Sequence, residues 1–250
     1  MPSDELGHAI KAMTSARVAL GRNGNSVPVR EVLDFQLAHA RARDAVHLPF
    51  DATGMCTELD GVFVRSAARD RTEYLRRPDL GRRLSEGGRE ALHKIRGAFD
   101  VVFVVADGLS PVAIHRNAAD LLRQLVSRLD DWRIAPTVVV EQGRVAIGDE
   151  IGELVGSSLA VVLIGERPGL ASPDSMGIYV TWNPIPGRTD AERNCISNIR
   201  PEGLSAGTAA ELLFLLLCKA RQNGLTGVGL GTAPGIVASE ARTLGPSTVN

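Results

Sequence analysis

The sequence predicts an α/β protein with a mainly parallel sheet and helices on both of its faces, preceded by a helical N-terminal region. Three observations predict this. Continuous apolar runs, typical of strands buried on both faces, recur from about residue 99 onward. Segments whose apolar residues recur at helical spacing alternate with these runs. Residues 1–98, by contrast, are rich in arginine, helical in pattern and poor in strand signals.

The N-terminal region is predicted to contain an amphipathic helix from Pro28 to Val46. Proline suits the start of a helix, and the apolar residues that follow recur at helical spacing: Val32, Phe35, Ala38, Ala42 and Val46. Arginines then cluster between Arg65 and Leu84, notably in the segment 77–84. They could pair with carboxylates of a partner subunit or with phosphate, or they could belong to a solvated surface with internal ion pairs.

The α/β domain, residues 99–230, is predicted to open with a strand at 101–106, a turn and a helix. Ser110 suits the N-cap of that helix, and Pro111 suits its first position. Further strands are predicted at 137–140, 159–164 and 177–182, with a helix at 149–155. A last helix carries a core-facing apolar stripe from Ala209 to Ala220. Residues 231–250 are predicted to be a flexible tail without a function.

The composition excludes several classes of protein. Hydrophobic residues make up 44% and charged residues 23% of the 250, and the net charge of -1 gives no general reason to expect a nucleic acid or a membrane as partner. The three cysteines are widely spaced, which favours a reducing compartment. The N-terminus lacks the apolar run of a signal peptide, and the apolar runs are too short to span a bilayer. We therefore expect a cytoplasmic protein.

Most catalytic signatures are absent from the sequence. It contains no GxxxxGK[ST] phosphate loop and no HExxH, its histidines have no metal-ligand spacing, and Gly227, Gly229 and Gly231 do not complete GxGxxG. The segment GLSAG (203–207) matches the nucleophile elbow GxSxG, but Pro201 argues against the strand that must precede an elbow. We expect Ser205 or Thr208 to cap the next helix instead.

Two carboxylates, Asp107 and Glu166, directly follow predicted strands. Sheets of this class bind ligands beyond the carboxyl ends of their strands. Both side chains are therefore expected to be exposed at a crevice, where they could accept hydrogen bonds from a ligand. The alternative for each is a helix cap, or a local ion pair such as that of Glu166 with Arg167.

Several motifs, taken together and in this order, resemble the small (light) subunit of ethanolamine ammonia-lyase. They extend the resemblance over nearly the whole chain, from Ser15 to Leu230, and they are RVALGR (17–22), RPDLGRRL (77–84), DGLS (107–110), GERPGL (165–170) and NCISNI (194–199). The resemblance implies a subunit of an adenosylcobalamin-dependent lyase that converts ethanolamine to acetaldehyde and ammonia by a radical mechanism.

The resemblance also implies partners and a location. In the family, a large subunit that is a TIM barrel holds the substrate, and a Rossmann-like small subunit covers one side of the cobalamin, whose own base stays on cobalt. The segment from Asp44 to His47 fails to match the DxHxxG signature of base-off binding, which agrees with this. We expect a hetero-oligomer in which residues 1–98 contact the large subunit. Some members are packaged in a bacterial microcompartment, but the short N-terminal extension argues against packaging here.

Three cobalamin contacts can be transferred by motif. They are Val145 in GRV (143–145), Glu166 after its strand, and Cys195 in NCI (194–196). Glu166 can accept hydrogen bonds from amides or hydroxyls, Val145 can offer apolar surface, and Cys195 can offer a small, soft packing group. Without the resemblance, Val145 and Cys195 would be interpreted as core residues. No catalytic residue and no metal ligand is expected in this chain. The alternative functions are a purely structural subunit and a nucleotide-dependent oxidoreductase.

Overall fold

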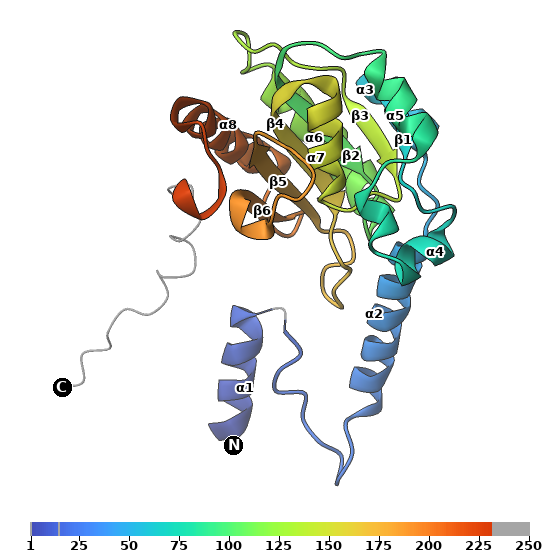
Figure 1. Cartoon of the computed structure of the whole chain (residues 1–250). Coiled ribbons are helices and arrows are strands. Elements are labelled where there is room, and N and C mark those ends of the chain that lie inside the picture. Colours follow the sequence, from blue (N-terminus) through green and yellow to red (C-terminus); the bar gives the residue numbers. More distant parts are fainter. Residues whose placement is uncertain (1, 15, 232–250) are drawn as a thin grey trace, which may run out of the picture.

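The computed structural model describes residues 2–14 and 16–231 (Figure 1). The predicted tail therefore lies outside the described residues, apart from Gly231. The α-helices are α1 (Pro2–Met13), α2 (Val29–His47), α3 (Ala52–Leu59), α4 (Arg71–Arg76), α5 (Glu86–His93), α6 (Pro111–Val126), α7 (Ile147–Val155) and α8 (Ala206–Asn223). The strands are β1 (Val62–Arg65), β2 (Phe99–Ala106), β3 (Val138–Glu141), β4 (Ser157–Gly165), β5 (Met176–Trp182) and β6 (Arg193–Ile199).

The six strands form one mixed sheet in the order β1-β3-β2-β4-β5-β6. The first four strands in this order are parallel, as predicted, whereas β5 is antiparallel to β4 and β6 is antiparallel to β5. The expectation of a mainly parallel sheet thus holds for one part of it. The reason is the connection 166–175, which contains no helix and is too short for the crossover that a parallel neighbour requires.

Strands β1 and β6, the two edges of the sheet, have no counterpart in the sequence prediction. β1 spans four residues and lies inside the region that was expected to be helical. β6 carries polar residues at several positions, and its buried and exposed residues do not form the continuous apolar run of a central strand. Edge strands pair along one side only, so their sequences carry weaker signals than those of central strands.

Helices cover both faces of the sheet, as predicted. Alternate residues of β2 point to opposite faces, so Val101, Phe103 and Val105 pack with α3, α6 and α8, whereas Val102 and Val104 pack with α5 and α7. On the second face, α7 packs on β4 and β2. The helices that pack on β5 and β6, namely α6 and α8, belong to the first face. On the second face, β6 reaches helix α7 through the buried ion pair of Arg193 with Asp149.

The starts of α6 and α8 lie where the sequence predicts them, but only α8 has the predicted cap. Ser205 caps α8, because its hydroxyl accepts a hydrogen bond from the Thr208 amide at 3.2 Å. The interpretation of GLSAG as a helix start is confirmed. Ser110 occupies the N-cap position of α6, but its hydroxyl instead donates to the Pro173 carbonyl at 2.7 Å. This side chain joins two loops and does not cap a helix.

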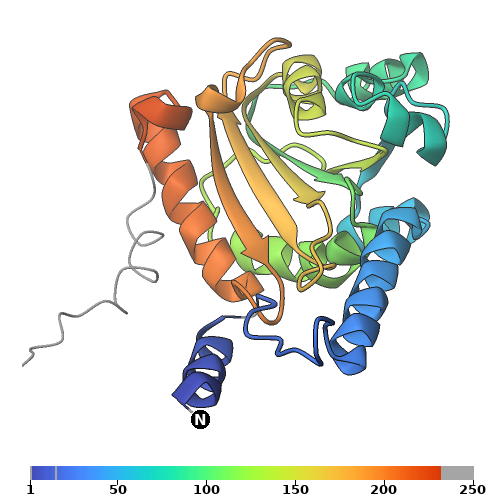
Figure 2. The ribbon, with the colours of Figure 1, turned by 90° about the horizontal axis from the view of Figure 1, so that it is seen from below.

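Helix α2 begins directly after Pro28, as predicted, but its apolar side is not buried in this chain. Val32 is 40% exposed and Phe35 is 46% exposed, and Ala45 is the one buried residue of the helix. Figure 1 shows α1 and much of α2 below the body of the sheet, and Figure 2 shows α1 apart from the sheet layers. The predicted helix is present, and it leaves an apolar surface open.

Candidate functional site

Three parallel strands end side by side at one edge of the sheet. Ala106 at the end of β2 is in register with Val140 of β3 on one side and with Ile164 of β4 on the other. The chain passes from β2 through α6 to β3, and then through α7, on the opposite face, to β4. The direction of winding reverses between β2 and β4, and such a reversal opens a crevice between the loops that follow the two strands.

Two glycines let these loops approach each other. A Cβ on Gly108, which has a φ of +54°, would overlap the carbonyl oxygen of Gly165, and a Cβ on Gly165 would overlap the carbonyl oxygens of Asp107 and Ser110. The Leu109 amide donates to the Gly165 carbonyl at 2.9 Å. The loops after β2 and β4 are thereby held against each other at the mouth of the crevice.

The crevice contains a hollow of about 450 Å³, called here the Glu166 hollow. It is bounded by residues from the loops after β2, β3 and β4, from strands β5 and β6, and from α4: Tyr74, Gly108, Leu109, Arg144, Val145, Ile164, Gly165, Glu166, Arg167, Tyr179 and Ser197. Two of the three predicted contacts, Val145 and Glu166, therefore line the same hollow. Val145 also packs against the core of the second face, so it forms a wall between core and hollow.

The Glu166 carboxylate is held by two serine hydroxyls. Ser175 donates to Oε2 at 2.5 Å, and Ser197 donates to Oε1 at 2.7 Å. Gly177 leaves room for the side chain, since a Cβ there would lie 2.8 Å from Oε1. The alternative of an ion pair with Arg167 does not occur, and within the described ranges no cation lies at salt-bridge distance from Glu166. Each carboxylate oxygen keeps a lone pair for a further donor.

Cys195 lies beside the Glu166 hollow and is not among the residues that line it. It is exposed on β6, opposite Tyr179 in the strand register, and it shares a face of β6 with Ser197. Crowding by neighbouring atoms and the charge of Glu166 raise the pKa of the Cys195 thiol, while the Tyr179 hydroxyl opposes this effect. Burial likewise raises the pKa of Tyr179. Both groups therefore stay neutral and protonated at neutral pH.

Asp107 is buried, so the expectation that it is exposed at the crevice is wrong. It accepts hydrogen bonds from the amides of Gln142 (2.7 Å) and Gly143 (3.2 Å), and it forms an ion pair with Arg71 at 2.8 Å. Burial raises the pKa of Asp107 to about 7, although Arg71 and the two amides favour the carboxylate. Arg71 also donates to the carbonyl of Val46 at 2.8 Å. Asp107 thus joins the crevice loops to the end of α2, and its burial keeps its carboxylate away from a ligand.

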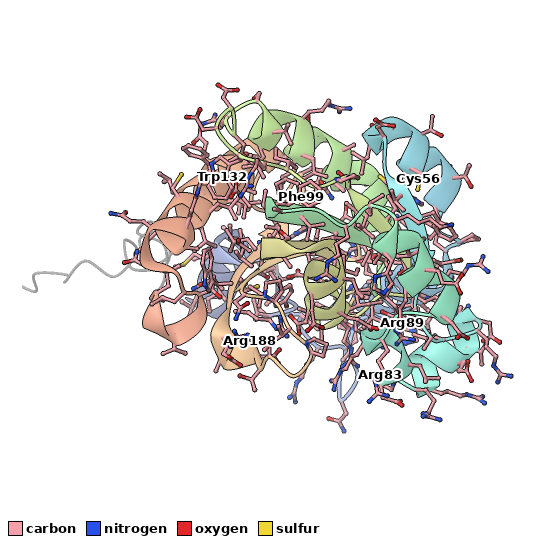
Figure 3. All side chains as sticks on the ribbon, turned by 45° about the horizontal axis from the view of Figure 1, so that its top comes forward. Cys56, Arg83, Arg89, Phe99, Trp132 and Arg188 are labelled. Carbon is pink, nitrogen blue, oxygen red and sulfur yellow. The ribbon has the colours of Figure 1, made fainter. Side chains whose placement is uncertain are left out.

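Arginines surround two further hollows next to the first. One, of about 430 Å³, is lined by Pro78, Arg82, Arg144, Val145, Ala146, Arg188, Thr189, Asp190 and Arg193. The other, of about 460 Å³, includes Arg83, Arg89 and Arg188, which lie on the same side of the molecule in Figure 3. Three of the six arginines that line these two hollows have carboxylate partners: Arg193 with Asp149, Arg188 with Glu192, and Arg89 with Glu150. Of the arginines in the segment 77–84, Arg77 pairs with Asp79 at 2.7 Å, whereas no carboxylate of the described residues lies within 4.0 Å of Arg82 or Arg83.

Sequence reasoning missed several residues of the site: Tyr74, Arg144, Tyr179, Ser175 and Ser197. Ser197 belongs to the quoted motif NCISNI, but without the strand register nothing indicated that it would contact a residue 31 positions earlier. Over residues 2–14 and 16–231, no group of three or more His, Cys, Asp or Glu residues is arranged to hold a metal ion. In the same part of the chain, no helix combines the length and the hydropathy needed to cross a membrane.

Comparison with known proteins agrees with the resemblance found in the sequence. The family model of the ethanolamine ammonia-lyase light chain matches residues 4–231. An ethanolamine ammonia-lyase small subunit of Pseudomonas fluorescens (strain Pf0-1) is 53% identical over 88% of this chain and 85% of its own length. Those of Pseudomonas putida (strain GB-1) and Pseudomonas aeruginosa (strain UCBPP-PA14) are 52% and 49% identical, over 89% and 96% of this chain and 86% and 92% of their own lengths.

Proposed function

Because the chain belongs to the ethanolamine ammonia-lyase light chain family, we propose that it is the small subunit of an adenosylcobalamin-dependent lyase that converts ethanolamine to acetaldehyde and ammonia. In this proposal the chain binds one side of the cobalamin at the Glu166 hollow. The observation that supports it best is that two hydroxyls orient Glu166 in a crevice, where no cation of the described residues lies within salt-bridge distance of its carboxylate. We further propose that the four parallel strands correspond to the Rossmann-like part of the family fold.

The residues of the hollow fit a corrinoid. When bound, adenosylcobalamin supplies a radical by homolysis of its cobalt–carbon bond, and the protein supplies binding and orientation. Glu166 would accept hydrogen bonds from amide or ribose groups through its remaining lone pairs. Val145 would offer apolar surface, and Cys195, with its neutral thiol, would pack at the adjoining strand. We expect base-on binding, since the sequence lacks the DxHxxG signature of the base-off mode.

The size of the hollow supports a shared site. A space of about 450 Å³ suits a small ligand, whereas a corrinoid with its nucleotide is too large to be enclosed there. The rest of the cofactor, and the substrate, would therefore be held by a large subunit with a TIM barrel. The apolar side of α2, which includes Val32 and Phe35, and the remainder of residues 1–98 would contact that subunit. We propose a cytoplasmic hetero-oligomer.

Removing the Glu166 carboxylate tests the proposed contact. In the complex of large and small subunits, Glu166→Ala should weaken the binding of cyanocobalamin about 10- to 100-fold, because hydrogen bonds to a charged group are lost. The dissociation constant can be measured from the visible absorbance of the cofactor. Glu153→Ala, at an exposed position of α7, is the matched control and should have no effect. Equal affinity of both variants and the wild type would favour a purely structural subunit.

The division of labour between the subunits gives a second test. The isolated chain, supplied with adenosylcobalamin and ethanolamine, should form no acetaldehyde, since the substrate site is assigned to the other subunit. Addition of the large subunit should start turnover, which can be followed with a coupled alcohol dehydrogenase. Acetaldehyde formation by the isolated chain would contradict the proposal.

A further inference from the structure

Arg144 is the arginine of the crevice that combines a fixed position with the lack of a counter-charge. It borders both the Glu166 hollow and the neighbouring arginine-lined hollow of about 430 Å³. In the described part of the chain, no carboxylate lies within 4.0 Å of its guanidinium. Its Nε is buried and has no hydrogen-bond partner. The two terminal nitrogens, Nη1 and Nη2, are not buried and make no hydrogen bond to the described residues, so they are free to donate to a ligand in the hollow.

The Arg144 side chain is held in place by its surroundings. Its guanidinium stacks on the ring of Tyr74, with Cζ at 4.4 Å from the ring centroid, and Arg71 stacks on the same ring at 4.9 Å. Tyr74 is itself fixed, since it is fully buried and its hydroxyl donates to the Gly143 carbonyl at 2.9 Å. The Arg144 amide donates to the Gly81 carbonyl at 2.7 Å. A cation held in this way loses little freedom when it binds a ligand.

Gly81 has a matching role in the segment 77–84. A Cβ at this position would lie 2.8 Å from Cγ of Arg144 and 2.8 Å from the Tyr74 ring. The glycine therefore provides the space in which the arginine lies along the ring. The other arginines near the crevice differ from Arg144. Arg71 and Arg193 are engaged by Asp107 and Asp149, and Arg167 is exposed and makes no such stack.

On the proposed function, which this inference rests on, the chemistry of the ligand indicates what Arg144 binds. The side-chain amides of the corrin are neutral, whereas the nucleotide loop of cobalamin contains one phosphodiester, which is an anion. Arginine is the side chain best suited to phosphate oxygens, because its planar fork of donors matches their geometry. We propose that Arg144 binds the phosphodiester of the cobalamin nucleotide loop. Glu166 and Arg144 then divide the work in one hollow, with Glu166 accepting from neutral donors and Arg144 donating to the anion.

The assignment can be tested by comparing corrinoids that carry a phosphate with one that lacks it. In the assembled complex, dissociation constants are measured for cyanocobalamin, cobinamide phosphate and cobinamide. Arg144→Gln should weaken binding of the two phosphate-bearing compounds about tenfold or more, and should leave cobinamide binding unchanged. Arg167→Gln, which removes the exposed arginine of the same hollow, is the matched control and should not discriminate between the three compounds.

The outcomes separate this inference from the proposed function. An equal loss for all three compounds would overturn the inference and assign Arg144 to a corrin amide or to a carboxylate of the large subunit. It is also overturned if Arg144→Gln has no effect, or if the phosphate-dependent loss appears in Arg167→Gln. If the wild-type complex binds cyanocobalamin, such results leave the proposed function intact; failure of the wild type to bind it contradicts both.

Two further measurements do not depend on the folding of Arg144→Gln. Arg144→Lys keeps the charge but not the planar fork, so its phosphate-dependent loss should be smaller than that of the glutamine variant. In the wild-type complex, added salt should weaken cobinamide phosphate more than cobinamide, because salt screens the attraction between cation and anion. Identical salt dependence of the two compounds would count against a cation at the phosphate.

Discussion

The loops after β2 and β4 begin in the same way but have different roles. Each starts with a carboxylate at the end of a buried parallel strand, Asp107 in one and Glu166 in the other, and the two strands are neighbours in the sheet. Asp107 is buried against a cation and two backbone amides. Glu166 lines a hollow and is held by two serine hydroxyls. The position after a strand does not decide the role of a carboxylate; its donors do.

The donors around Asp107 and Glu166 differ in how much of each carboxylate they leave free to accept a hydrogen bond from a ligand. Arg71 neutralises Asp107, and the buried amides use its remaining oxygen, so the group ties parts of the chain together. A serine hydroxyl orients a carboxylate oxygen without neutralising it, and each oxygen of Glu166 retains acceptor capacity toward the hollow. An oriented carboxylate that keeps its charge and lone pairs suits ligand binding.

The largest expected effect comes from Asp107→Ala. The change leaves the Arg71 cation and the amides of Gln142 and Gly143 without their acceptor, and removal of one partner from a buried pair costs about 3–5 kcal/mol. We therefore expect a large fall in the free energy of unfolding, measured by urea denaturation of the small subunit. Glu166→Ala is the matched control on the same sheet edge and should cost about 1 kcal/mol, because its serine partners can be hydrated.

The losses of unfolding free energy in these two variants test the comparison directly. Asp107→Ala should act on stability, and Glu166→Ala should act on cofactor affinity. If the two variants lose the same stability, the distinction between the two loops fails. A stable Asp107→Ala variant with weakened cobalamin binding would instead move Asp107 into the binding site.

A smaller effect is expected from Ser197→Ala. Without this hydroxyl, Oε1 of Glu166 loses a donor at 2.7 Å and the carboxylate is less well oriented. We expect the dissociation constant for cyanocobalamin to rise about 3- to 10-fold in the assembled complex, which corresponds to one hydrogen bond. Ser158→Ala, at an exposed position of β4, provides the control. Equal affinities of the two serine variants would show that Ser197 does not position Glu166.

The sequence by itself determined the central elements of the fold. The strands β2 to β5 and the helices α2, α6, α7 and α8 were predicted within a few residues, because a continuous apolar run or a helical apolar period is a local property of the chain. The same holds for the start of α8, where Ser205 makes a hydrogen bond only three residues away. The motif order also indicated the family, which comparison with known proteins confirms.

The tertiary structure alone decided which side chains meet. The antiparallel direction of β5 and β6 brings Ser197 to Glu166, and the packing of α4 beneath the loop after β3 brings Tyr74 to Arg144. It also buried Asp107 while it left Glu166 open. No local pattern carries this information, because each contact joins residues far apart in the chain. The residues next to a carboxylate in the sequence also do not indicate whether its hydrogen-bond donor will be a cation or a hydroxyl.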